Sequence, residues 1–287
     1  MDSGLSGLVD GAERRSVRRT RGMGHGGITR LMSPSDLGEL LKPFVFLDRI
    51  ELRGAGPMQM GWHPHSGIAT VSYLFEGAAS YEESNGSQGV IPAGGVEWMR
   101  AGGGVWHTGG AAAAGTLRGY QLWVALPAAL ENGPTESRYL APSEVPTVGP
   151  ARVILGRLGE VTSPVPSPEG MSYLAVSLAA GERWTYQPPA GHTVAFAAVH
   201  TGALVGPEPV AQGELVVFAE GDGALRFEAA VATDLIVGSA VKHPHDLVLG
   251  RYSVHTSPGA LRQGEGEIAR LGRELRAQGR LQQRPER

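Results

Sequence analysis

Two histidines separated by one residue carry the clearest chemical signal in the chain. His63 and His65 flank Pro64 inside a Gly-containing stretch, residues 61–67. In an extended strand, residues two apart point to the same face, so both imidazoles can bind one metal ion through neutral nitrogens. An isolated His-x-His motif also arises by chance, so the motif alone does not establish a metal site.

A third histidine strengthens this interpretation. His107 lies in a similar Gly-flanked segment, and a turn-punctuated hairpin separates it from His65. The chain has no Cys, which excludes disulfides, thiolate-bound zinc, iron–sulfur clusters and thiol nucleophiles. Any metal must therefore be bound by His, carboxylate or water.

A second His-Pro-His motif carries less weight. His243 and His245 flank Pro244, but no matching third His follows in a comparable segment. His255 could pair with them, although we expect a structural role in a segment that returns towards the first half of the chain. A phosphate-binding loop and a Gly-x-Ser-x-Gly nucleophile motif are both absent from the sequence.

Composition limits the classes of protein and partner. The chain of 287 residues has 43 Gly and 20 Pro, yet 41% of its residues are hydrophobic. Without a Gly-X-Y period, this composition favours short strands joined by tight turns. A net charge of −3 provides no strong field for nucleic acid or an anionic membrane.

No apolar run approaches the roughly 20 residues that cross a bilayer. The arginines between positions 14 and 21 are not followed by the apolar stretch of a targeting signal. We therefore predict a soluble cytoplasmic protein.

The elements that must position the histidines are mostly strands. Ser33 to Asp36 predicts the start of a short helix with Ser33 as its cap, and Pro43 ends it. Two strand-rich blocks with a weak internal repeat follow, and apolar positions in residues 259–282 predict a C-terminal amphipathic helix. We predict an all-β fold of two jelly-roll barrels with these two helices.

The predicted domain boundaries follow from shifts in composition. They are a flexible basic arm (1–30), a metal-binding barrel (31–135), a Pro-rich linker (136–150), a second barrel without metal (151–245), and a C-terminal segment with the amphipathic helix (246–287).

Several segments of the sequence resemble those of a known family. The segments HPHSGIATVSYLFEG and GVIPAGGVEWMRAGGGVWHTGG, together with the preceding PFVFLD, resemble the paired motifs of the pirin family of bicupins. The resemblance is strong over about residues 25–126 and weaker beyond them. It implies two cupin barrels packed face to face, with one divalent metal ion in the N-terminal barrel. Iron is typical there, and Zn, Ni, Cu or Mn are alternatives.

The same resemblance identifies the ligands. His63, His65 and His107 match three of them, but the fourth, a glutamate two residues after the last histidine, is replaced by Gly109. Glu97 occupies the place where the general cupin pattern has a His ligand, three residues after Gly94 of a Pro-x-Gly turn. Its carboxylate could be the fourth ligand or a general base, or it could be a hydrogen-bonded Glu without either role.

Two functions are compatible with these motifs. The first is an oxidoreductase similar to quercetin 2,3-dioxygenase, which acts on a small aromatic, flavonol-like substrate. The second is a non-enzymatic protein in which the metal or its redox state alters a surface that binds a protein partner. A cavity of a few hundred Å³ reaching the metal would favour the enzyme, and a closed barrel would favour the second function.

Overall fold

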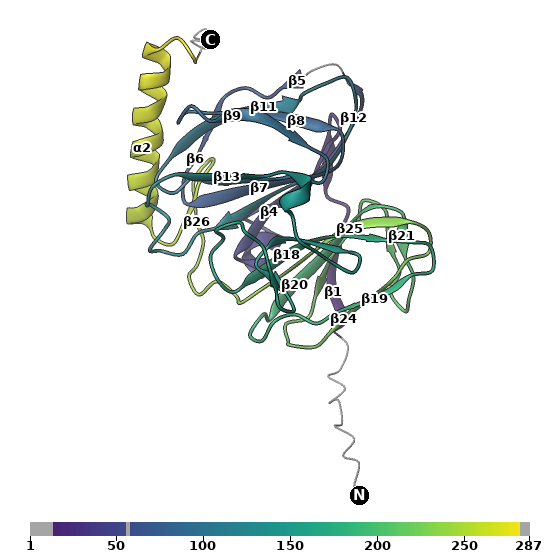
Figure 1. Ribbon diagram of the computed structural model, residues 1–287. Helices are drawn as coiled ribbons and strands as arrows, with labels where there is room; N and C mark the ends of the chain where they lie inside the picture. Colours follow the sequence, from purple (N-terminus) through teal and green to yellow (C-terminus); the bar gives the residue numbers. More distant parts are fainter. Residues whose placement is uncertain (1–13, 56–57, 282–287) are drawn as a thin grey trace, which may run out of the picture.

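The computed structural model describes residues 14–55 and 58–281. Two β barrels are stacked on each other, and the helix α2 (Pro258–Ala277) runs along the flank of the N-terminal barrel (Figure 1). A short helix, α1 (Leu37–Leu41), precedes the first long strand. The predicted all-β fold of two jelly-roll barrels with two helices is confirmed.

The N-terminal barrel consists of a seven-stranded and a five-stranded sheet. The first sheet has the order β13 (Glu136–Leu140), β10 (Val96–Arg100), β7 (Ile68–Glu76), β12 (Gly115–Ala125), β4 (Phe44–Ala55), β3 (Ile28–Met32) and β2 (Met23–His25). The second contains β5 (Met58–Gln59), β11 (Val105–Ala111), β8 (Ala78–Glu83) and β9 (Gln88–Pro92), with β6 (His63–His65) paired to β11.

The C-terminal barrel contains a second seven-stranded sheet. Its order is β1 (Ser16–Thr20), β23 (Leu215–Phe218), β20 (Val194–Thr201), β25 (Thr233–Ala240), β18 (Met171–Leu178), β15 (Ala151–Leu155) and β14 (Thr147–Val148). Three two-stranded sheets complete it: β16 (Arg157–Leu158) with β17 (Val161–Thr162), β19 (Arg183–Tyr186) with β24 (Leu225–Glu228), and β21 (Ala203–Leu204) with β22 (Val210–Ala211).

The two seven-stranded sheets pack against each other through the largest apolar core. Trp98 and Tyr120 from the first sheet and Tyr173 and Phe196 from the second are buried in this core. Because side chains alternate along a strand, Trp98 faces the other barrel while its neighbour Glu97 faces the interior of its own. Burial of each such aromatic side chain stabilises the fold by roughly 1.5–3 kcal/mol. The contact between the barrels therefore fixes which face of the sheet is apolar, and the polar residues lie on the opposite face.

The interior of the C-terminal barrel is mostly apolar. Its buried cluster includes Leu174, Val176, Tyr186 and Val237, all of which are 0% exposed. These side chains form a packed core of their own, and a structural role for this barrel remains a prediction.

The described part of the segment predicted as a flexible arm, residues 1–30, is paired with both barrels. β1 lies at the edge of the C-terminal sheet, with Ser16 opposite Phe218. The guanidinium of Arg14 donates to the carbonyl oxygen of Ala219, at 2.7 Å, and to that of Thr193. The segment is ordered here because it covers a sheet edge whose backbone groups need partners; residues 1–13 lie outside the described residues.

Two further boundaries differ from the prediction. Residues 136–140 of the predicted linker form β13, which pairs with β10 and so belongs to the N-terminal barrel. The cap of α1 is Asp36, whose carboxylate also accepts from the backbone N–H of Ser33 at 2.7 Å. The carboxylate satisfies the N–H of Leu37 at the start of this short helix, a role the Ser33 hydroxyl was expected to fill.

The C-terminal segment returns to the N-terminal barrel as expected. The hairpin of β26 (Val248–Leu249) and β27 (Val254–His255) leads into α2, which begins at Pro258 after the cap Ser257. Within the described residues, no helix combines the length and apolar character needed to span a bilayer.

Candidate metal centre

Neighbouring strands β6 and β11 bring the three predicted metal ligands together. His63 and His107 are direct partners across this antiparallel pair, and His65 lies opposite Val105. Directly opposite residues point to the same face, as do residues two apart. One ring nitrogen from each of His63, His65 and His107 accordingly lies within 4.8 Å of the other two.

Backbone carbonyl groups set the tautomers of two of these rings. Nδ1 of His63 lies 2.9 Å from the carbonyl oxygen of Gly61, and Nδ1 of His65 lies 3.0 Å from that of Tyr252. A carbonyl oxygen can only accept, so each Nδ1 must carry the proton and donate. Nε2 of each neutral ring is then unprotonated, which is the form that binds a metal.

Burial keeps the rings neutral. His65 is 0% exposed and His107 is 4% exposed, whereas His63 is half-buried. Loss of hydration lowers the pKa of His65 to about 3, and the neighbouring His63 contributes to this decrease. Burial also lowers the pKa of His63 and of His107. Metal binding near neutral pH would therefore not have to compete with protons on these rings.

Two buried nitrogens without partners are consistent with a cation between the rings. Nε2 of His65 and Nε2 of His107 are buried and have no hydrogen-bond partner in the described structure. A buried polar atom without a partner costs roughly 1–3 kcal/mol, and a metal ion would satisfy both lone pairs. Three imidazoles form a donor set suited to Fe, Ni, Cu or Zn, and leave a coordination position open.

The cluster contains no carboxylate ligand. Among the described residues, it consists of His63, His65 and His107 alone. Position 109, which lies two residues after His107 and on the same face, is a glycine opposite Tyr81. The geometry therefore offers a site with three neutral ligands and no anionic one.

Glu97 lies outside this cluster but within the same barrel. It is 4% exposed and lies on β10 opposite Ser72, with whose hydroxyl it forms a hydrogen bond. Burial raises the pKa of Glu97 to about 7; Ser72 opposes this shift, and the negative charge of Glu83 adds to it. A carboxyl group that titrates near neutral pH can act as a general base. This role of Glu97 remains a prediction.

Glu83 is a buried carboxylate that the sequence analysis missed. It is 0% exposed and lies directly across from His107 in the pairing of β8 with β11. Its oxygens accept from Ser137 Oγ at 2.7 Å, from Asn85 Nδ2 at 2.8 Å and from the Tyr139 hydroxyl. No local motif indicates Glu83, because its position depends on strand register.

The other predicted histidines lie apart from this cluster. Nε2 of His243 is 3.3 Å from the carbonyl oxygen of Leu126, and His245 is exposed. Nε2 of His255 lies 3.0 Å from Oγ of Ser66. Among the described residues, none of these three belongs to a group of side chains that could hold a metal.

Two cavities lie away from the histidine cluster. One of about 170 Å³ lies beside His243 and His245, where the barrels meet. The other, of about 380 Å³, lies between α2 and residues 103–104 and 132–135. His63, His65 and His107 line neither cavity, so these spaces do not provide the predicted substrate cavity at the metal.

Comparison with known proteins agrees with the fold and with the predicted family. The pirin family model matches residues 27–124. A Pseudomonas aeruginosa protein, provisionally named a quercetin 2,3-dioxygenase, is 31% identical over 230 residues, which cover 73% of this chain and 79% of that protein. A pirin-like protein from Caulobacter vibrioides is 31% identical over 222 residues, which cover 71% of this chain and 75% of that protein.

A solved structure extends the likeness to both barrels. The crystal structure of quercetin 2,3-dioxygenase from Acinetobacter baumannii superposes with a TM-score of 0.83 at 22% identity, covering 90% of this chain and 98% of that one. At this identity, the likeness shows the two-barrel fold.

Proposed function

This chain belongs to the pirin family, and from that premise we propose that it is a metal-dependent dioxygenase that cleaves flavonol-like substrates with O2. The observation that carries the proposal is the convergence of His63, His65 and His107 within 4.8 Å inside the N-terminal barrel. The name of the Pseudomonas aeruginosa relative supports the choice of reaction.

The three histidines would hold one divalent ion. Nε2 of His63 and of His65 is available because Nδ1 of each ring donates to a carbonyl oxygen. Bound there, the ion would act as a Lewis acid towards the hydroxyl and ketone oxygens of a flavonol. Iron is the metal that the family resemblance implies, although three neutral imidazoles also suit Ni, Cu and Zn.

The substrate would reach the cluster from the side of His63. His65 and His107 are buried, whereas His63 is partly exposed. Neither cavity described above includes the histidines, so we expect the substrate to approach the cluster beside His63.

Glu97 would remove the phenolic proton of the substrate. Its pKa of about 7 means that part of the population is ionised at neutral pH, and an ionised carboxylate can accept this proton. The neighbouring Glu83 is held by three donors, and its negative charge adds to the raised pKa of Glu97.

The test combines elemental analysis of the purified full chain with oxygen uptake on a panel of flavonols. We expect one equivalent of metal and oxygen uptake that requires both the metal and a flavonol. The variant with His63→Ala and His65→Ala is the control, and it should lose both. Stoichiometric metal without oxygen uptake on any flavonol would reject the enzyme and favour a non-enzymatic metal-dependent binding protein.

A further inference from the structure

The segment from Tyr252 to Thr256 lies along the strand that carries two of the three histidines. Ser66 and Ser253 form a parallel bridge, and the N–H of Val254 donates to the carbonyl oxygen of Ser66 at 3.3 Å. The carbonyl oxygen of Tyr252 accepts from Nδ1 of His65 at 3.0 Å. A metal-ligand candidate thus depends for its orientation on a residue 187 positions later in the chain.

Buried polar side chains hold this segment in place. Oγ of Ser66 donates to Oγ of Ser253 at 2.8 Å and lies 3.0 Å from Nε2 of His255. The carboxylate of Glu131 accepts from the N–H of Thr256 at 2.7 Å and from its hydroxyl at 2.8 Å. Nδ1 of His255 lies 3.3 Å from Oε2 of Glu131, at ion-pair distance but not aligned as a hydrogen bond.

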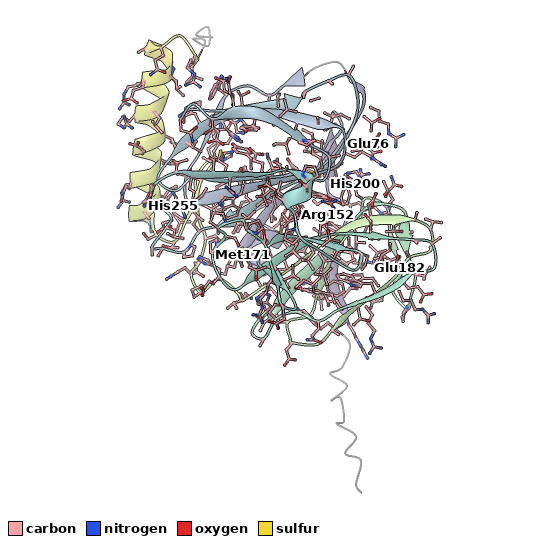
Figure 2. All side chains as sticks on the ribbon, in the orientation of Figure 1. Glu76, Arg152, Met171, Glu182, His200 and His255 are labelled. Carbon is pink, nitrogen blue, oxygen red and sulfur yellow. The ribbon has the colours of Figure 1, made fainter. Side chains whose placement is uncertain are left out.

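The polar side chains of this cluster are almost completely buried. Ser66 is 0% exposed, Ser253 and His255 are 2% exposed, and Glu131 is 3% exposed. Buried polar groups are stable only when they are paired, so displacing the segment would leave several of them without partners. Figure 2 shows His255 beside the lower part of α2, on the flank of the N-terminal barrel.

A serine, a histidine and a carboxylate in contact, as in Ser66, His255 and Glu131, also occur in nucleophilic enzymes. This cluster, however, has no room for a substrate. Gly264 of α2 covers it so closely that a Cβ there would lie 2.5 Å from Oγ of Ser66 and 2.6 Å from Nε2 of His255. The helix seals the serine instead of exposing it. The arrangement is therefore suited to holding two segments together.

Helix α2, which follows this segment, contacts β11, the strand that carries His107. Nε1 of Trp106, the residue before His107, donates to the carbonyl oxygen of Ile268 in α2 at 2.7 Å. A Cβ at Gly272 would lie 2.9 Å from the ring of the same tryptophan. The C-terminal segment thus contacts both β6 and β11.

We infer that Glu131 and His255 are positioning residues of the metal centre: they hold the carbonyl oxygen of Tyr252 against Nδ1 of His65 and so keep Nε2 of His65 free for the metal. The inference rests on the proposed metal site. Hydrogen-bond partners of metal ligands typically change affinity on the order of 10- to 100-fold when they are removed, and here the partner is itself held by Glu131 and His255.

The test measures Co(II) affinity of the full chain by competition with a chelator. Glu131→Ala and His255→Asn should weaken binding on the order of 10- to 100-fold and shift the visible absorption bands of the bound Co(II). Glu131→Gln keeps an oxygen that can accept from Thr256 and should restore much of the affinity. His192→Asn is the matched control, because His192 is 4% exposed and bonded to Ser239 in the other barrel; it should change neither readout.

A second measurement depends neither on activity nor on a bound metal. The ¹⁵N chemical shifts of His65 in the metal-free full chain should show the proton on Nδ1, and Glu131→Ala should produce a mixture of tautomers. A proton on Nε2 in the wild-type protein would overturn the inference. So would wild-type Co(II) affinity and spectrum in folded Glu131→Ala and His255→Asn, or covalent labelling of Ser66 by a fluorophosphonate.

The two proposals can fail separately. If His63→Ala with His65→Ala retains one equivalent of metal, the proposed site is wrong. If that variant loses metal but Glu131→Ala and His255→Asn do not weaken binding, only the positioning role is wrong.

Discussion

Gly109 lies against the carbonyl oxygen of Ser80 in the neighbouring strand: a Cβ at position 109 would be 2.7 Å from that oxygen. The glycine is therefore matched to the close approach of β11 and β8. It also occupies the position at which the family resemblance places a glutamate ligand, so one residue accounts both for the tight strand contact and for the lack of a carboxylate at this position.

We predict that Gly109→Glu strengthens Fe(II) binding at the expense of stability. An added carboxylate supplies the anionic oxygen ligand that a hard divalent ion prefers, but overpacking at a tight contact costs roughly 1–3 kcal/mol. Chemical denaturation and Fe(II) titration measure the two effects. Gly109→Ala, the matched control, should lose similar stability without any gain in affinity; equal Fe(II) affinity in both variants would show that position 109 does not reach the metal.

The two His-Pro-His motifs should differ in their effect on metal content. His63→Ala with His65→Ala should abolish stoichiometric metal, because it removes two of the three clustered nitrogens. The fold should persist, since the barrels have a large core of their own. His243→Ala with His245→Ala should leave metal content unchanged. Elemental analysis and circular dichroism measure these outcomes, and loss of metal only in the second variant would move the site to the C-terminal segment.

Local patterns were sufficient to predict much of the candidate centre. His63 and His65 share a face because of the two-residue period of a strand, and this period does not depend on the rest of the fold. Trp98 next to Glu97 likewise indicates one apolar and one polar face. The contact between the two barrels then gives these faces their directions, in agreement with the family resemblance.

Strand register and distant contacts could not be predicted in the same way. Glu83 lies opposite His107 only because β8 and β11 pair in one particular register, and a shift of one residue would reverse its direction. The pairing of Ser16 with Phe218 and the contact of His65 with Tyr252 join residues about two hundred positions apart. Nothing in the composition of residues 14–21 or 252–256 identifies these partners.

His200 should make the unfolding free energy depend on pH. Figure 2 shows it at the boundary between the barrels, and its Nε2 lies 3.0 Å from the carbonyl oxygen of Ile50. Burial lowers its pKa to about 4; the positive charges of Arg49 and Arg118 also lower it, and Glu51 opposes them. An unfolded histidine titrates near 6.5, so between about pH 6.5 and pH 4 the unfolded state binds the extra proton.

Stability should therefore fall as the pH decreases through this window, by at most about 1.4 kcal/mol per pH unit from this one residue. Denaturant titrations of the wild type and His200→Gln should diverge accordingly, with the shallower pH dependence in the variant. His245→Gln is the control at an exposed histidine and should follow the wild type. Parallel curves for the wild type and His200→Gln would contradict the lowered pKa.

Glu97 should show the opposite pH dependence. Burial raises its pKa to about 7, and the charge of Glu83 adds to the shift. An unfolded glutamate titrates near 4.3, so between these values the folded state retains a proton that the unfolded state has released. The contribution of Glu97 to folding is therefore largest at low pH and declines as the pH rises to about 7.

Glu97→Gln imitates the protonated acid and should lack this decline, so its stability relative to the wild type should increase between pH 5 and pH 8, by up to about 3 kcal/mol. Glu160→Gln, at an exposed position, should leave the pH dependence unchanged.

If Glu97 is also the general base, oxygen uptake should rise with pH through about 7 in the wild type and lose this step in Glu97→Gln, while metal content stays the same. Loss of metal in Glu97→Gln would instead identify Glu97 as a ligand, because a side chain that only exchanges a proton has no reason to change metal content.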